Sequence, residues 1–168
     1  FTVHIAAKHP VLKAFAAHPA IKDICHDLIG DDVRLYWDQA VYKKPEKPQE
    51  FPWHQDNGYT FIEPQQYLTL WIPLVDVDEE TGCPWIAPGL HRLGTFEHWK
   101  SDIGLVCLEQ APDAVAAPAR AGDIVVFSSP VPGWSASRHW DRPMTYWAAK
   151  FLEHGYVLED SLRPQCEH

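Results

Sequence analysis

After Gly30 the sequence breaks into short apolar segments separated by turn-forming residues, and this pattern limits the possible folds. Short segments rich in β-branched and aromatic side chains predict strands when Gly, Pro or acidic residues bound them. The expected strands cover residues 33–42, 67–75, 83–87, 123–128 and 145–152. Strands spaced in this way favour a β-sandwich or barrel over a series of βαβ units.

The first 30 residues have a different pattern, in which apolar side chains recur at helical spacing. Pro10 and Pro19 each suit the first position of a helix, and Gly30 suits the residue at which a helix stops. We therefore expect two helical pieces that cover one side of a sheet. Together, the helices and strands predict a mainly β protein with N-terminal helices.

The chain has 168 residues, which suits one domain with a buried core. We expect a single domain over residues 1–168, with a helical lead-in at 1–30 and a β core at about 33–153. Periodicity is weak over about 95–118, so this stretch is expected to be an insertion or a lid.

Charge and motifs exclude several classes of function. The formal net charge of −9 argues against nucleic acid or an anionic membrane surface as a partner. No apolar run is long enough for a membrane span, and the first residues do not have the pattern of a signal peptide. The four widely spaced cysteines are expected to be reduced thiols of a cytoplasmic protein. The sequence also lacks a GxSxG elbow, a P-loop and a GxGxxG motif.

The segment FPWHQDNGY, residues 51–59, contains the strongest candidate for a metal site. His54 and Asp56 are two residues apart, so in an extended chain their side chains project to the same face. Two histidines and one carboxylate form the three-ligand set that holds Fe(II) in non-haem oxygenases and leaves positions open for O₂ and a co-substrate. Aromatic and apolar neighbours suit a half-buried site, although an H-x-D pair alone is a weak signal.

Three blocks of sequence, in this order, resemble the phytanoyl-CoA dioxygenase family of Fe(II)/2-oxoglutarate oxygenases. The blocks are WHQDNGY at 53–59, LTLWIPLVDVDEETGCPWIAPGLHRLG at 68–94 and AGDIVVFSS at 121–129. The resemblance implies a double-stranded β-helix, a jelly-roll of the cupin-like type. It also implies an oxidoreductase that uses Fe(II), 2-oxoglutarate and O₂ to hydroxylate a small-molecule substrate.

The resemblance assigns roles to individual residues. His54 and Asp56 match the first two metal ligands of the family. Trp71 resembles the aromatic residue that lines the co-substrate pocket, and Ser135 matches the hydroxyl residue two positions after the distal histidine.

The last part of the family pattern is not kept. The distal histidine would fall at Gly133, and the arginine that binds 2-oxoglutarate would fall at Met144. Glycine has no side chain to bind iron, and methionine cannot pair with a carboxylate.

Three accounts of this departure remain open. In the first, His139 completes the metal site, and Lys150 or Arg142 binds the far carboxylate of 2-oxoglutarate. In the second, two protein ligands and water hold the metal. In the third, the chain is a degenerate, non-catalytic member of the family that binds a metal or a small molecule.

The N-terminus begins later than is usual for the family, so we expect the chain to be trimmed. A trimmed domain can leave a sheet edge that a second chain covers, so a homodimer remains an alternative to a monomer.

Overall fold

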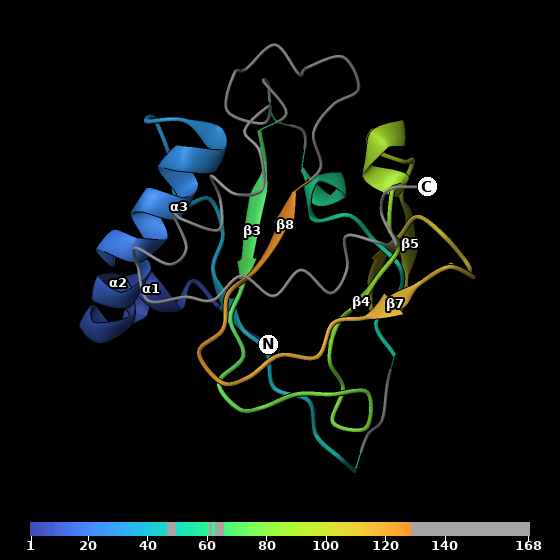
Figure 1. The fold of residues 1–168 in the computed structure, drawn as a ribbon. Coiled ribbons are helices and arrows are strands. Elements are labelled where there is room, and N and C mark those ends of the chain that lie inside the picture. The colour runs from blue at the N-terminus through green and yellow to red at the C-terminus, as the bar shows by residue number, and fades with distance from the viewer. Residues whose placement is uncertain (47–49, 61, 63–65, 129–168) are drawn as a thin grey trace. The chain divides into compact units, whose positions relative to one another are not determined.

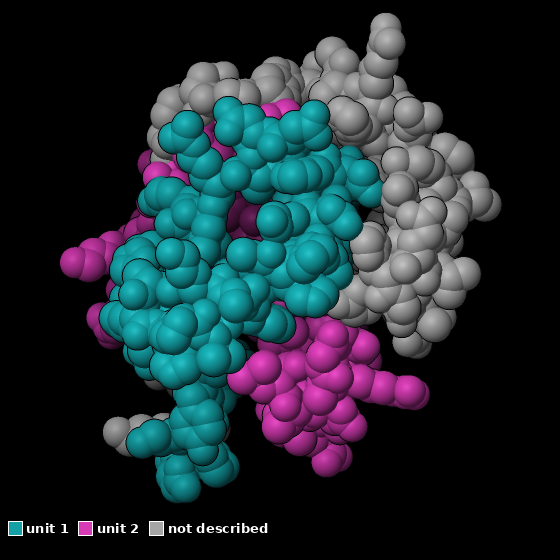
Figure 2. All heavy atoms as spheres, turned by 90° about the vertical axis from the view of Figure 1, so that its left-hand side faces the viewer, with its two compact units in different colours: residues 1–51 teal, residues 52–168 magenta. Residues whose placement is uncertain are grey.

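The computed structural model describes residues 1–46, 50–60, 62 and 66–128. The chain divides into two compact units, residues 1–51 and residues 52–168, which Figure 2 colours separately. The expected strand at 145–152 lies outside the described residues.

Unit 1 is mainly helical (Figure 1). Its helices are α1 (Ile5–Lys8), α2 (Pro10–Ala16) and α3 (Pro19–Ile29). Pro10 and Pro19 each occupy the first helical position, and Gly30 ends α3 with a φ of 98°. The sequence prediction of two helical pieces with these boundaries is confirmed, and α1 adds one short turn before them.

A histidine precedes each of these prolines and caps the next helix. The Val11 N–H donates to His9 Nδ1 at 3.3 Å, and the Ala20 N–H donates to His18 Nδ1 at 3.2 Å. Each contact satisfies one of the backbone donors that have no partner inside the first turn. The two His-Pro steps therefore start the helices α2 and α3 by the same local device.

The strands of unit 1 are short. Strand β1 (Thr2–Val3) pairs antiparallel with β2 (Gln39–Ala40). The prediction of a continuous strand over 33–42 is wrong, because only these two residues of the segment pair and β1 is itself two residues long. The large side chains of Leu35 and Tyr42 are 61% and 77% exposed, so burial does not order the rest of the segment as a strand.

The described part of unit 2 is built from short strands and 3₁₀ turns (Figure 1). The strands are β3 (Leu68–Trp71), β4 (Trp85–Ile86), β5 (Trp99–Ser101), β6 (Gly104–Val106), β7 (Val115–Ala116) and β8 (Val125–Ser128), and the 3₁₀ turns are η1 (Asp56–Tyr59) and η2 (Leu90–Leu93). Within the described residues they form the antiparallel pairs β3–β8, β4–β7 and β5–β6.

Three of the predicted strands of unit 2 are observed, each shorter than expected. Strand β3 stops at Trp71 because Pro73 comes shortly after it and has no N–H to donate to a neighbouring strand. Strands β4 and β8 lie inside the expected ranges 83–87 and 123–128. The prediction of N-terminal helices followed by short strands is therefore confirmed for the described part of the chain.

Residues 95–118, expected as an insertion or a lid, contain β5, β6 and β7. Strand β7 pairs with β4, and the Cys107 N–H donates to the Trp53 carbonyl at 2.8 Å. Val106, Cys107 and Ala117 are among the most buried apolar residues of unit 2. This stretch therefore contributes to the framework that surrounds residues 53–59.

The described cysteines, Cys25, Cys83 and Cys107, form no disulfide with one another. Among the described residues, no helix has both the length and the apolar character needed to cross a lipid bilayer.

Candidate metal centre

His54 and Asp56 lie next to each other on one face of the chain. Gln55, between them, has the extended conformation φ −111°, ψ 133°, so its two neighbours project to the same side. His54 Nε2 is 3.4 Å from Asp56 Oδ1. Their side chains are 29% and 41% exposed, which leaves the pair accessible to a small molecule. We call this side of the segment the ligand face.

Contacts with Pro52 and Tyr59 orient the His54 ring. His54 Nδ1 is 2.7 Å from the Pro52 carbonyl oxygen, which can only accept, so Nδ1 holds the proton and donates. This leaves Nε2 as the nitrogen that faces Asp56. The Tyr59 ring packs edge-on against the His54 ring, with centroids 5.7 Å apart. Tyr59 is itself fixed, because its hydroxyl accepts from the Leu105 N–H at 2.9 Å.

Asp56 is oriented by strand β3. The Thr69 hydroxyl donates to Asp56 Oδ2 at 2.6 Å, which directs Oδ1 toward His54. Hydrogen bonds of this kind, to the groups that bind a metal, fix the orientation of ligands in metalloproteins. Each member of the pair is therefore held at one atom and presents the other to its neighbour.

The two groups shift each other's protonation. The hydrogen bond with Asp56 is the largest influence on His54 and raises the pKa of the imidazole, while burial acts in the opposite direction. Burial is the largest influence on Asp56 and favours its neutral form. The hydrogen bonds from His54, in its protonated form, and from Thr69 together outweigh burial and hold the pKa of Asp56 below its ordinary value. The carboxylate is therefore ionised at neutral pH, as a metal ligand must be.

The distance between these two atoms is close to that expected for two ligands of one divalent metal. Ligands about 2.1 Å from an ion and about 90° apart lie about 3 Å from each other. The observed 3.4 Å between His54 Nε2 and Asp56 Oδ1 needs only a small closure to reach that arrangement. Among the described residues, no group of three His, Cys, Asp or Glu side chains is placed to hold a metal. A third protein ligand would therefore come from outside the described residues.

The opposite side of the segment contacts residues 94–98, which we call the strap, and we name this side the strap face. The Gln55 amide forms two hydrogen bonds with the strap backbone: Nε2 donates to the Gly94 carbonyl at 3.0 Å, and Oε1 accepts from the Phe96 N–H at 2.7 Å. The Gln55 backbone N–H donates to His98 Nε2 at 3.0 Å. His98 Nδ1 in turn donates to the Phe96 carbonyl at 2.8 Å.

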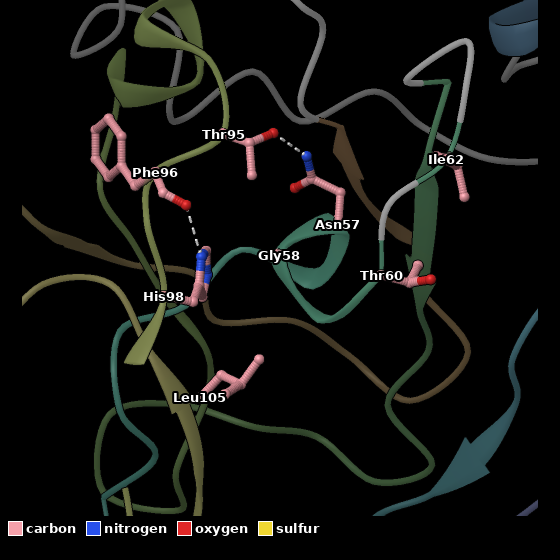
Figure 3. Close-up of a pocket in the computed structure, with 8 residues that line it drawn as sticks. All are labelled: Asn57, Gly58, Thr60, Ile62, Thr95, Phe96, His98 and Leu105. Atoms are coloured by element: carbon pink, nitrogen blue, oxygen red, sulfur yellow. Dashed lines mark hydrogen bonds between the residues drawn. The ribbon is translucent and has the colours of Figure 1, made fainter. Parts of the chain in front are cut away.

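Asn57 and Gly58 continue the strap face. Asn57, the one buried polar residue of the described chain, donates from Nδ2 to Thr95 Oγ1 at 2.5 Å. A Cβ on Gly58 would overlap the His98 ring, so only glycine allows the ring to lie this close. Figure 3 shows Thr95 and His98 directed toward the turn of Asn57 and Gly58. A cavity of about 230 Å³ lies beside this turn, and Ile62, Phe96 and Leu105 supply its apolar lining.

The remaining residues expected at the site divide into two groups. Trp71 lies at the end of β3, two residues after Thr69, and is partly buried. The others lie outside the described residues, as do the two positions at which the family pattern is not kept: Gly133, Ser135, His139, Arg142, Met144 and Lys150. The proposed third ligand and the 2-oxoglutarate contacts therefore stay predictions.

Sequence reasoning missed five residues that support the pair: Gln55, Asn57, Gly58, Thr69 and His98. Thr69 could have been found from the sequence. It lies two residues before Trp71 in a predicted strand, so the two side chains share a face. His98 could not, since it lies 43 residues from Gln55 in a stretch with weak periodicity.

Comparison with known proteins shows the family of the chain. The family model for phytanoyl-CoA dioxygenase (PhyH) matches residues 2–132. The chain therefore belongs to the phytanoyl-CoA dioxygenase family, as its sequence blocks predicted. The match ends immediately before Gly133, the position expected for the distal histidine. No solved structure gives a significant match.

Three curated relatives show the range of the similarity. The chain is 24% identical to phytanoyl-CoA dioxygenase domain-containing protein 1 of Mus musculus, over 96% of this chain and 50% of that protein. It is 28% identical to 2-aminoethylphosphonate dioxygenase of the uncultured bacterium HF130_AEPn_1, over 92% of this chain and 58% of that protein. It is also 28% identical to a probable alpha-ketoglutarate-dependent hypophosphite dioxygenase of Stutzerimonas stutzeri, over 52% of this chain and 30% of that protein. The chain thus spans about a third to just over half of these relatives.

Proposed function

We propose that this chain is the metal-binding part of a non-haem Fe(II)- and 2-oxoglutarate-dependent dioxygenase that hydroxylates a small organic substrate. The observation behind the proposal is the 3.4 Å approach of His54 Nε2 and Asp56 Oδ1, each group anchored at its other polar atom. The dioxygenase names of the relatives support the class of reaction. The name of the hypophosphite dioxygenase supports 2-oxoglutarate as the co-substrate.

The chain's own groups would have distinct tasks. His54 and Asp56 would hold Fe(II), which supplies the oxidising chemistry when O₂ and 2-oxoglutarate are bound. Thr69 would keep the Asp56 carboxylate turned toward the ion, and Tyr59 would keep the His54 ring from rotating. The family fold proposed for the whole protein is a double-stranded β-helix, in which this pair would lie inside the barrel.

Trp71 is proposed to line the co-substrate pocket. Residues two apart in a strand share a face, so Trp71 projects from β3 on the same side as Thr69, which contacts Asp56. We propose that His139 supplies the third metal ligand. Ser135 would contact 2-oxoglutarate, and Lys150 or Arg142 would neutralise its far carboxylate.

A second candidate function is motivated by Gly133 and Met144. If no other residue replaces the missing imidazole and guanidinium, the chain would bind a metal or a small acid without turnover. Where a metal is bound, the two candidates share the pair His54 and Asp56 and differ in whether that metal supports turnover.

The test is oxygen-dependent release of succinate from 2-oxoglutarate in the presence of Fe(II). The dioxygenase predicts release that disappears in a His54→Ala, Asp56→Ala double variant. The non-catalytic candidate predicts no release above background, but a higher melting temperature with Fe(II) or Mn(II), because a ligand selective for the folded state stabilises it. A melting temperature unchanged by Fe(II), Mn(II) and 2-oxoglutarate, together with no succinate release above background, would contradict both candidates.

A further inference from the structure

We propose that the strap, residues 94–98, presets the geometry of His54 and Asp56, and that Gln55 and His98 are the residues through which it acts. This inference rests on the proposed metal-binding function, which it deepens by naming the positioning residues. It concerns the backbone between the two ligands rather than the ligands themselves.

The strap can act on the two ligands because neighbouring side chains of an extended chain point to opposite faces. His54 and Asp56 point to the ligand face, while Gln55 points to the strap face. Four hydrogen bonds join Gln55 and Asn57 to the strap: two from the Gln55 amide, one from the Gln55 backbone and one from the Asn57 amide. Holding Gln55 on both its backbone and its side chain fixes the direction in which both ligands leave the chain.

Both ring nitrogens of His98 form hydrogen bonds that position the segment. Its Nε2 accepts from the Gln55 N–H, and its Nδ1 donates to the Phe96 carbonyl. Both nitrogens are therefore engaged, so neither is free to bind a metal. The ring also lies against Gly58, where a Cβ would overlap it. His98 thus touches the segment on both sides of Asp56 and acts on the metal pair through the backbone.

The ligands need this support because their own contacts are few. His54 and Asp56 are 29% and 41% exposed, and one hydrogen bond to Pro52 and one to Thr69 orient them. A metal site requires its ligands to stay within about 0.5 Å of the productive positions. Contacts that bridge 38 to 43 residues of sequence cannot come from local chain stiffness, so the strap supplies this rigidity.

The experiment compares four variants with the wild type. Gln55→Met keeps the bulk of the side chain and removes both amide hydrogen bonds. His98→Asn is too short to accept from the Gln55 N–H, whereas the Oε1 of His98→Gln can occupy the position of Nε2 and restore that bond. Asp76→Ala is the matched control. It also removes a hydrogen bond between a side chain and distant backbone, which the Ala121 N–H donates to Asp76 Oδ1 at 2.9 Å, but it leaves the strap intact.

Two measurements are made on each protein. The first is the NMR order parameter of the His54 and Asp56 backbone amides without metal. We expect about 0.85 in the wild type, Asp76→Ala and His98→Gln, and a fall toward about 0.6 in Gln55→Met and His98→Asn. The second is the affinity for Co(II), followed by its visible absorption. We expect a loss of about tenfold or more in Gln55→Met and His98→Asn, with rescue in His98→Gln.

The outcomes distinguish the role of the strap from the proposed metal-binding function. Equal order at His54 and Asp56 in all five proteins would overturn the role of the strap, whatever the metal data show. A wild type that binds no Co(II) would overturn the proposed function, and the order parameters would still decide whether the strap fixes the pair. Loss of Co(II) affinity in Asp76→Ala equal to that in Gln55→Met would also overturn the proposal, because it would show a general effect of stability.

Discussion

The two faces of residues 54–58 differ in how they are held. The ligand face has two half-exposed side chains, each with one anchoring hydrogen bond, to Pro52 or to Thr69. The strap face has a doubly bonded amide, a buried asparagine and a glycine against an imidazole ring. The residues that could do the chemistry are thus the less constrained ones, and their neighbours hold most of the contacts.

This difference gives a physical reason for the H-x-D spacing. An ion needs ligands with free lone pairs and open space beside them, so the ligands cannot also be packed on all sides. The intervening residue points the other way and can be bonded fully without blocking the ion. The comparison predicts that changes on the strap face alter both stability and metal affinity, while changes on the ligand face alter mainly metal affinity.

The largest effect is expected from Gly58→Ala. The new methyl group would overlap the His98 ring, which its hydrogen bonds to Gln55 and Phe96 hold in place. Overpacking of this kind costs about 1–3 kcal/mol, so the free energy of unfolding in urea should fall by that amount. Co(II) affinity should fall with it, because His98 must move away from Gln55.

Gly89→Ala is the control for this prediction. Gly89 has a φ of 77° and open space around its Cβ position, so alanine there adds backbone strain of about 1 kcal/mol without a clash. It should leave Co(II) affinity unchanged. If Gly58→Ala were as stable as the wild type, the contact between the strap and this turn would not be a source of rigidity.

A second, smaller change in stability and a loss of metal affinity are expected from Thr69→Val, which alters a contact to the ligand face. Valine keeps the shape and the strand preference of threonine but cannot donate to Asp56 Oδ2. The carboxylate would be free to rotate, so Co(II) affinity should fall about tenfold. The free energy of unfolding should change by no more than about 1 kcal/mol, as one hydrogen bond is lost.

Thr69→Ser tests the cause of that effect, because it keeps the hydroxyl and removes the methyl group. Its Co(II) affinity should stay near that of the wild type. A loss in Thr69→Ser equal to that in Thr69→Val would assign the effect to packing of β3 instead of to the orientation of Asp56.

The sequence predicted the features that depend on local rules. Pro10, Pro19 and Gly30 marked helix ends that the structure confirms, since proline and glycine act through their own backbone angles. The approach of His54 to Asp56 agrees with the alternation of an extended chain. The strap contacts could not be predicted, because they join residues about 40 apart.

One wrong prediction and one stretch that the sequence left unassigned have the same origin. The segment 33–42 has the composition of a strand, but within the described residues only Gln39 and Ala40 of it pair as a strand. Residues 95–118 show weak periodicity, yet their short strands pair with β4 and with each other. Pairing depends on the partner as well as on the segment, and composition describes only the segment.

The smallest change in stability is expected at a contact that, like the strap contacts, joins a side chain to backbone, but between residues close in sequence. In the turn after β3, Asp78 Oδ1 accepts from the Thr81 N–H and from the Thr81 hydroxyl, each at 2.8 Å, and the Asp78 N–H donates to Thr81 Oγ1 at 2.8 Å. The hydrogen bonds from Thr81, first from its backbone and then from its side chain, lower the pKa of Asp78. Because the folded pKa is depressed, this stabilisation is present above the unfolded value of about 3.9 and is lost as pH falls through the folded value.

Asp78→Asn should therefore have a slightly lower melting temperature than the wild type at pH 7, and the gap should close on acidification below about pH 4. Glu79→Gln, which removes the same charge one residue further on, should show no such closing gap. The change in melting temperature should be small for two reasons. Asp78 is exposed, and the turn joins residues only three apart, so its hydrogen bonds restrict only a short piece of the chain. If Asp78→Asn destabilised the protein as much as Gly58→Ala, the stabilisation from these contacts would not depend on sequence separation. The proposed difference between the strap and the local turn would then be wrong.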